Sequence, residues 1–243
     1  FDLQPEEEKW FASIEQIRTL QLIDAEYYIN DRLAAGDNIL AEGAQGMMLD
    51  IDFGTYPYVT SSNTISSGVC SGLGVPPSSV REVIGVTKAY CTRVGSGPFP
   101  SELTGEDGER IRIAGHEFGS TTGRPRRCGW LDVPQLKYAA MITGCTQLAI
   151  TKLDVLNAFE SIAVAEKYKL GTIETDRLPF DIIEDITGVV HTQHKGWLQD
   201  IASDTYEGLP IEVRNYLAYL EQQLSLPVVF VSTGPGREEL IVR

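Results

Sequence analysis

The stretch DVPQLKYAAMITGCTQLAITKLD (132–154) holds a helix, a turn and a strand that together decide the fold. Asp132 and Pro134 favour the start of a helix, and Gly144 is the residue type that most often ends one. The run QLAIT (147–151) then predicts a short buried strand, and polar residues follow it directly. A helix that leads into a buried strand is typical of an α/β protein.

The same alternation continues outward along the chain. Apolar residues at helical spacing predict helices from about residue 10 to 35 and from Pro210 onward, and a capping box formed by Ser79 and Glu82 predicts another that runs to about Thr92. Short apolar runs predict strands at 38–42, 162–168, 228–231 and 239–242. We therefore expect an α/β fold with a largely parallel sheet flanked by helices, in one domain over residues 1–243 with no internal boundary.

The composition excludes several classes of protein. The 243 residues are 42% hydrophobic and carry a net charge of −14, from 20 Lys and Arg against 34 Asp and Glu. An acidic chain of this kind lacks the clustered basic face that binds phosphate backbones, so we expect no nucleic-acid partner. No apolar run is long enough to cross a bilayer, so we expect no membrane partner.

The four cysteines are far apart in the sequence and form no Cys-x-x-Cys pair: Cys70, Cys91, Cys128 and Cys145. A chain of this length and apolar content does not need a disulfide framework. We expect four reduced thiols and a cytoplasmic location.

Polar, glycine-rich residues follow three of the predicted strands, at 42–46, 151–154 and 232–236. Ligands of open parallel sheets gather beyond the carboxyl ends of the strands. At the second of these ends, a carboxylate on Asp154 is able to accept two N–H bonds from the edge of guanine, and the stem of Lys152 is able to lie along a base. The alternatives are tight turns at the first and third ends and a surface ion pair at the second.

The segment STTGRPRR (120–127) places three arginines within four residues. Arginine forks bind carboxylates and phosphates in bidentate fashion, and neighbouring hydroxyls add donors. The segment therefore indicates an anion site, with a solvated surface run as the alternative. The hydroxyl-rich run TSSNT (60–64) suits either a phosphate or a helix cap.

Two acidic residues and two absent motifs bear on phosphoryl transfer. Asp50 and Asp52 would share a face of a strand and suit Mg²⁺ or acid–base chemistry, although solvated loop carboxylates are the alternative. The 243 residues contain no GxxxxGK[ST] phosphate loop and no GxGxxG fingerprint. A self-contained phosphoryl-transfer site is therefore not evident.

Five segments, in family order, resemble adenylosuccinate synthetases: EGAQGMMLDIDFGTYPYVTSSNT (42–64), TRVGSGPFPSEL (92–103), GSTTGRPRRCGWLD (119–132), TKLDVL (151–156) and STGPGREEL (232–240). The resemblance spans about residues 40 to 243, and its first and third segments are long. It implies the single-domain fold of that family. It also implies a GTP-dependent ligase that joins IMP to L-aspartate in the synthesis of AMP, with GTP as co-substrate and Mg²⁺ as cofactor. The family is dimeric, so we expect a homodimer.

The resemblance also implies roles for individual residues. The IMP-binding residues would be Gln45, Thr60, Val94 and Arg124. The aspartate-binding loop would be Ser120, Thr121, Thr122, Gly123, Arg124, Pro125 and Arg126. The GTP-binding residues would be Arg126, Lys152, Leu153, Asp154, Ser232, Thr233 and Gly234.

The chain departs from the family pattern at its start. The family's phosphate loop, its general-base aspartate and its general-acid histidine lie near the N-terminus, whereas this sequence opens on Phe1 and resembles the C-terminal part of the family. We therefore expect no catalytic residue and no metal ligand in this chain, and no activity from it alone. The alternatives are a binding-only fragment that holds nucleotide without catalysis and an unrelated anion-binding α/β domain.

Overall fold

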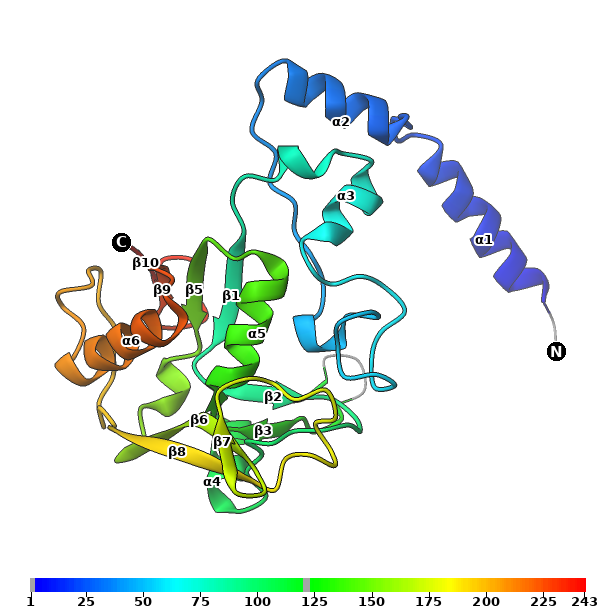
Figure 1. The fold of residues 1–243 in the computed structure, drawn as a ribbon. Coiled ribbons are helices and arrows are strands. Elements are labelled where there is room, and N and C mark those ends of the chain that lie inside the picture. Colours follow the sequence, from blue (N-terminus) through cyan, green and yellow to red (C-terminus); the bar gives the residue numbers. More distant parts are fainter. Residues whose placement is uncertain (1–2, 120–122) are drawn as a thin grey trace. The chain divides into compact units, whose positions relative to one another are not determined.

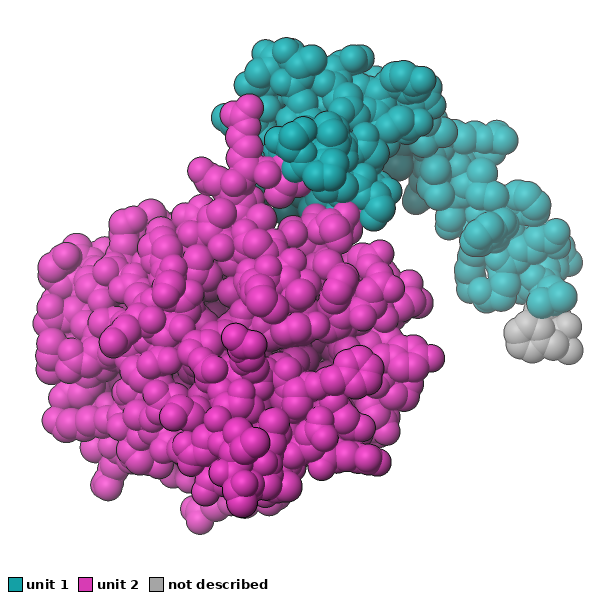
Figure 2. Space-filling model, in the orientation of Figure 1, with its two compact units in different colours: residues 1–42, 69–79 teal, residues 43–68, 80–243 magenta. Residues whose placement is uncertain are grey.

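The computed structural model describes residues 3–119 and 123–243. The chain divides into two compact units, one formed by Phe1–Glu42 with Val69–Ser79 and the other by Gly43–Gly68 with Val80–Arg243 (Figure 2). The expectation of one domain without an internal boundary stays a prediction. All predicted site residues that the structure describes belong to the second unit.

The first unit is helical, with α1 (Gln4–Ile17), α2 (Ala25–Ala34), most of α3 (Ser67–Leu73) and the short 3₁₀ turn η2 (Pro77–Ser79) (Figure 1). The prediction of one helix over residues 10 to 35 is therefore wrong. The Thr19 hydroxyl donates to the Gln16 carbonyl at 2.7 Å, which closes α1. Asp24 then takes the extended backbone of an N-cap before α2.

The predicted strand at 38–42 is also wrong. These residues have no regular secondary structure, and the side chains of Ile39 and Leu40 are 41% and 88% exposed. A short apolar run becomes a strand only where a neighbouring strand pairs with it, and within the described ranges none does.

The second unit contains a four-stranded sheet in the order β1-β5-β9-β10. Its strands are β1 (Ile84–Lys88), β5 (Gln147–Thr151), β9 (Val228–Ser232) and β10 (Leu240–Val242). The first three are parallel, and β10 returns antiparallel to β9. The predicted strands 147–151, 228–231 and 239–242 and the α/β class are thus confirmed.

A second sheet forms around β6 (Ser161–Leu170), which confirms the strand predicted at 162–168. It pairs in parallel with β4 (Leu131–Asp132) and antiparallel with β7 (Ile173–Thr175) and β8 (Gly188–Lys195).

A separate ribbon pairs β2 (Cys91–Arg93) with β3 (Arg127–Gly129). The remaining elements are α4 (Glu106–Ala114), η1 (Met47–Leu49) and η3 (Asp154–Leu156). Parallel pairing therefore dominates only the sheet that contains β5.

The helix predicted from Ser79 to Thr92 is wrong, because this segment forms β1 and β2. Val83, Val86 and Thr87 are β-branched and favour strands. An added Cβ on Gly85 would be 2.6 Å from the Cys145 sulfur, just before β5, and 3.1 Å from the Leu148 side chain of β5. Pairing with β5 overrides the capping box.

Helix α5 (Val133–Thr143) has the predicted ends. The Asp132 carboxylate accepts the N–H of Gln135 at 3.1 Å, and Gly144 adopts the left-handed φ of 65° that closes the helix. Helix α6 (Ile211–Leu224), predicted from Pro210, buries Val213, Tyr216, Leu217 and Leu220 in the core. The Tyr216 hydroxyl donates to Ala89 O at 2.8 Å, which ties α6 to the end of β1.

Asp132 makes stability depend on pH. Burial raises the pKa of its carboxyl from 3.8 to about 6, although hydrogen bonds from Tyr168 and Gln135 favour the ionised form. The folded state thus binds more protons than the unfolded state between these values, so the contribution of Asp132 to stability falls as pH rises through this window. As pH rises through this window, we expect the free energy of unfolding of the wild type to fall by up to about 3 kcal/mol relative to that of the Asp132→Asn variant, whose residue 132 stays neutral. Urea unfolding of both proteins across this pH range measures the difference, and a constant difference would contradict the prediction.

Candidate functional site

The carboxyl ends of β5 and β9 carry the residues predicted to bind guanine. Because the two strands are parallel neighbours, with Ile150 opposite Val231, their ends lie at the same edge of the sheet. Lys152, Leu153 and Asp154 follow β5, and Thr233 and Gly234 follow β9 at Ser232. The structure therefore brings these predicted residues together.

Lys152 and Asp154 have distinct local environments. Lys152 adopts a left-handed φ of 63°, which is uncommon outside glycine, and its ammonium donates to Gly115 O at 3.1 Å. Asp154 is half-buried, and burial together with the charge of Glu239 raises the pKa of its carboxyl. Backbone N–H groups and Lys152 oppose this rise. The strained backbone and the partly desolvated carboxylate are typical of a binding site.

The hairpin between β9 and β10 holds the other side of this edge. The Ser232 hydroxyl donates to Gly234 O at 2.7 Å, and the N–H of Thr233 donates to Glu239 O at 2.9 Å. The Glu239 carboxylate accepts the N–H of Gly236. These bonds fix the backbone of the turn, so its carbonyl and amide groups hold a defined geometry.

A buried ionic cluster lies at the end of β1. The carboxylate of Glu117 is 1% exposed and accepts from Lys88 Nζ at 2.7 Å and from the Tyr90 hydroxyl at 2.6 Å through Oε1. Its Oε2 accepts from the Arg126 guanidinium at 2.7 Å. Burial raises the pKa of Glu117, but the hydrogen bonds from Lys88, Tyr90 and Arg126 outweigh it and hold the pKa below its ordinary value. The carboxylate is thus ionised beside two cations.

The rest of the arginine-rich segment is partly described. Ser120, Thr121 and Thr122 lie outside the described residues. Gly123, Arg124 and Pro125 are exposed, and Arg124 O accepts the N–H of Gly119 at 2.8 Å. Arg127, by contrast, forms a bidentate pair with Glu102. Arg127 therefore has a structural partner.

Thr60 and Val94, two of the predicted IMP-binding residues, belong to segments that Arg93 connects. Arg93 of β2 donates to Thr55 Oγ1 at 2.9 Å and to Tyr58 O at 3.1 Å, which places the turn before Thr60 beside the strand before Val94. In the β2–β3 ribbon, Arg93 lies opposite Arg127. The segments that contain Thr60 and Val94 therefore lie beside the arginine-rich segment.

Gln45 lies at the far end of the same loop. It is exposed and has a left-handed φ of 67°. The Thr64 hydroxyl donates to the neighbouring Gly46 O at 3.0 Å, which ties the two ends of the loop 46–64 together. This contact does not itself place Gln45 against Thr60.

Asp50 and Asp52 do not form a carboxylate pair. Asp50 is completely buried and accepts the N–H groups of Asp52 and Phe53 through one oxygen and of Thr64 and Ile65 through the other. Asp52 is exposed and accepts from Asn63. Throughout residues 3–119 and 123–243, no three His, Cys, Asp or Glu side chains group as a metal site. Because both carboxylate oxygens of Asp50 accept backbone N–H groups, this residue does not fit the role of a Mg²⁺ ligand.

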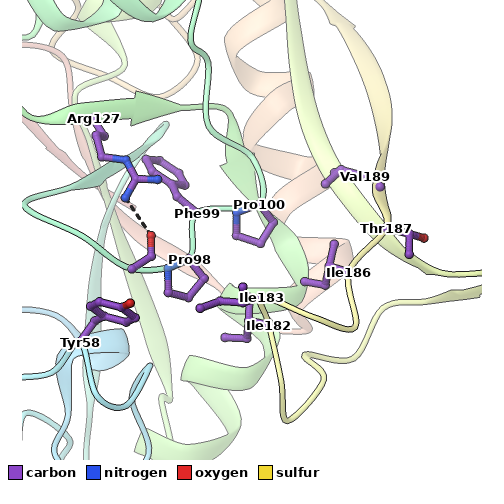
Figure 3. Close-up of a pocket in the computed structure, with 12 residues that line it drawn as sticks. Tyr58, Pro98, Phe99, Pro100, Arg127, Ile182, Ile183, Ile186, Thr187 and Val189 are labelled. Carbon is purple, nitrogen blue, oxygen red and sulfur yellow. Dashed lines mark hydrogen bonds between the residues drawn. The ribbon is translucent and has the colours of Figure 1, made fainter.

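A pocket of about 470 Å³ lies beside the candidate site (Figure 3). Its walls are Pro98–Pro100 and the segment Ile182–Val189, with Tyr58 at one end. Arg127 Nη1 donates to Gly97 O at 2.8 Å at its edge. Arg127 of the arginine-rich segment lines this pocket, whereas none of the described residues predicted to bind IMP, aspartate or GTP does.

Lys88, Tyr90 and Glu117 were not predicted from the sequence. Lys88 ends β1 opposite Thr151, and would have been found as a fourth polar strand end had residues 84–88 been assigned to a strand. Glu117 lies only nine residues before Arg126, but neither spacing nor composition indicates that it is buried.

In the described part of the chain, no helix is long and apolar enough to span a membrane.

Comparison with known proteins gives consistent results. Residues 1–241 match the family described as Adenylosuccinate synthetase. The adenylosuccinate synthetase of Cytophaga hutchinsonii is 50% identical over 244 residues, which cover 100% of this chain and 57% of that protein. That of Parabacteroides distasonis has the same identity and coverage. The chain thus spans a little over half the length of these relatives.

A solved structure indicates the same family as the sequence comparisons do. The fully ligated adenylosuccinate synthetase from Plasmodium falciparum superposes with a TM-score of 0.92 at 39% sequence identity. The match covers 100% of this chain and 58% of that one. The fold of this chain is therefore that of more than half of a synthetase.

Proposed function

We propose, because this chain belongs to the adenylosuccinate synthetase family, that it carries the guanine-, IMP- and aspartate-binding residues of a GTP-dependent ligase. The reaction joins IMP to L-aspartate and yields adenylosuccinate, GDP and phosphate, in the synthesis of AMP. The observation that carries the proposal is the arrangement of Asp154 and the 232–234 turn on parallel neighbouring strands.

The chemistry proceeds in two steps. The γ-phosphoryl group of GTP is transferred to O6 of IMP while the N1 proton of the base is removed, which releases GDP and turns a poor leaving group into phosphate. The α-amine of aspartate then attacks C6, loses a proton and displaces the phosphate. The binding residues contribute by holding the reacting atoms close and aligned.

Asp154 selects guanine by charge and geometry. Its carboxylate accepts from N1–H and from the exocyclic amine of guanine, whereas adenine presents an unprotonated N1 at that edge. Lys152 lies beside the base, and Leu153 with Ser232, Thr233 and Gly234 completes the pocket. The half-burial of Asp154 supports this role, because a desolvated carboxylate discriminates strongly between donors and acceptors.

The remaining roles follow the same chemistry. The segment Ser120–Arg126 closes over aspartate, where Arg124 bridges aspartate and IMP, and Arg126 reaches the GTP phosphates. Gln45 contacts the IMP base near the 6-oxygen, Thr60 binds the IMP phosphate, and Val94 touches the ribose. The adjacency of Thr60, Val94 and the arginine-rich segment supports this assignment.

The general acid, the general base and the Mg²⁺ ligands of the reaction are proposed to lie outside this chain. Its 243 residues contain no phosphate-loop motif, and Asp50 uses its oxygens on backbone N–H groups. We therefore propose that the chain alone does not turn over. A homodimer is proposed from the family resemblance, and a cytoplasmic location from four unpaired thiols.

Calorimetric titration of the chain with GTP, with ATP as the matched control, tests the proposal. We expect GTP to bind and ATP to bind at least tenfold more weakly, and no adenylosuccinate to form when IMP, aspartate and Mg²⁺ are added. Equal binding of GTP and ATP would favour an anion-binding domain without base selection. Formation of adenylosuccinate would overturn the proposed inactivity.

A further inference from the structure

Glu117 holds Arg126 at two points. Its carboxylate accepts from the guanidinium at 2.7 Å, and its main-chain oxygen accepts the N–H of Arg126 at 2.9 Å. The Arg126 side chain is 31% exposed, and among the described residues its Nε is buried without a hydrogen-bond partner. The guanidinium is therefore anchored on one side and keeps donor capacity on the other.

The Glu117 carboxylate also holds a second cation, Lys88. Lys88 Nζ lies 2.7 Å from Oε1 of Glu117 and also donates to Thr92 Oγ1 at 3.0 Å. Its side chain is 27% exposed. Two positive charges and one negative charge leave the cluster with a net charge of +1, in a chain whose net charge is −14.

The position of the cluster connects it to the nucleotide edge. Lys88 ends β1 opposite Thr151, the last residue of β5, and Lys152 donates to Gly115 O, two residues before Glu117. The segment 115–117 therefore contacts both the guanine-binding residues and Arg126. A buried ion cluster adds little to stability compared with apolar side chains of the same size. This argues that its charges serve a ligand.

We infer that Glu117 is a positioning residue, which holds the Arg126 guanidinium and the Lys88 ammonium in place to bind the polyphosphate of the nucleotide. The inference rests on the proposed function, because GTP is the nucleotide that function assigns to this edge. It adds Lys88 as a polyphosphate-binding residue.

The Glu117→Asp variant separates position from charge, because it keeps the carboxylate and withdraws it by one methylene. We expect calorimetry to give about tenfold weaker GTP binding by this variant and guanosine binding within twofold of wild type, since guanosine lacks the phosphates. The matched control is Glu102→Asp, which shortens the partner of Arg127 in the same way and should leave GTP binding unchanged.

Glu117→Gln changes the charge of the cluster. It removes one negative charge, so the net positive charge of the cluster rises by one. A purely electrostatic role predicts tighter binding of inorganic tripolyphosphate by this variant, and that result would overturn the inference. Positioning predicts weaker binding, because the amide keeps only one of the two acceptor oxygens and presents an NH₂ group to one of the two cations. Equal losses of GTP and guanosine binding in Glu117→Asp would indicate a structural role and would also overturn it.

NMR of the guanidinium decides the question independently of GTP. In the free wild-type chain, we expect separate, slowly exchanging Nη signals of Arg126, which collapse in Glu117→Asp. Unchanged signals would overturn the inference even if GTP binds. If the signals collapse and tripolyphosphate binding weakens while wild type shows no preference for GTP over ATP, the proposed function fails and the positioning role of Glu117 stands.

Discussion

Replacing Asp154 by Asn is expected to change the preference between GTP and xanthosine triphosphate by about 100-fold or more. In the proposed guanine site, the carboxylate would accept two N–H bonds from the base, whereas an amide accepts one and presents an NH₂ group to the other donor. Losing a hydrogen bond to a charged group costs roughly 1.5–3 kcal/mol, which corresponds to about 10- to 150-fold in Kd. Xanthine carries a carbonyl in place of the exocyclic amine, so the new amide gains a bond of similar size.

Calorimetric titration of wild type and Asp154→Asn with GTP, xanthosine triphosphate and ATP measures this exchange. Asp176→Asn is the matched control, because Asp176 bonds to Lys137 and lies outside the predicted site. Its nucleotide preferences should match those of wild type. A variant of Asp154 that binds GTP as wild type does would remove this residue from the guanine site.

The pH dependence of nucleotide binding tests the Asp154 carboxylate in a second way. Burial raises the pKa of Asp154, so the carboxyl takes up a proton at a higher pH than an exposed aspartate does. The protonated group accepts fewer N–H bonds. The preference for GTP over ATP should therefore be lost as pH falls through this raised pKa, and Asp154→Asn should show no such loss.

The sequence predicts well the segments whose local signals agree with their neighbours. Asp132 and Gly144 are strong capping residues, and the run between Gln147 and Thr151 is apolar and short, so α5 and β5 appear as expected. The polar residues after β5 and β9 were predicted to share an edge, because parallel strands end on the same side. The pairing of β5 with β9 confirms this arrangement.

The sequence fails where a distant partner decides the structure. Ser79 and Glu82 form a good local helix start, yet β5 recruits residues 84–88 as a strand. Because residues 79–92 were predicted to be helical, Lys88 was not recognised as the last residue of a strand. Glu117 was missed for a related reason, because its burial depends on Tyr90 and Lys88, which precede it by more than 25 residues.

Asp50 and Asp52 illustrate the same limit at the scale of two residues. Their spacing and charge are symmetric in the sequence, which suggests a shared role. In the structure, Asp50 turns inward and organises the loop that contains Thr60, while Asp52 faces solvent with one bond to Asn63. Only the path of the chain from 50 to 65 distinguishes them.

Replacing Asp50 by Ala is expected to lower the free energy of unfolding by about 4 kcal/mol, because several buried N–H groups lose a charged acceptor at once. The N–H bonds from Phe53, Asp52 and Thr64 hold the pKa of Asp50 below its ordinary value despite its burial, which shows that the folded state favours the ionised form. The bonds to Phe53 and Thr64, at 3.0 and 2.7 Å, join the two ends of the loop. Urea unfolding measures the loss, and amide exchange at Phe53 and Thr64 locates it.

The Asp52→Ala variant is the control that makes this result specific. It removes the same charge two residues away and breaks only the exposed bond to Asn63, so we expect a change within about 0.5 kcal/mol. Since Thr60 N–H donates to Leu49 O next to Asp50, loosening the loop should also weaken IMP binding in Asp50→Ala and not in Asp52→Ala. Equal effects of the two substitutions would mean that net charge, rather than the backbone bonds of Asp50, holds the loop in place.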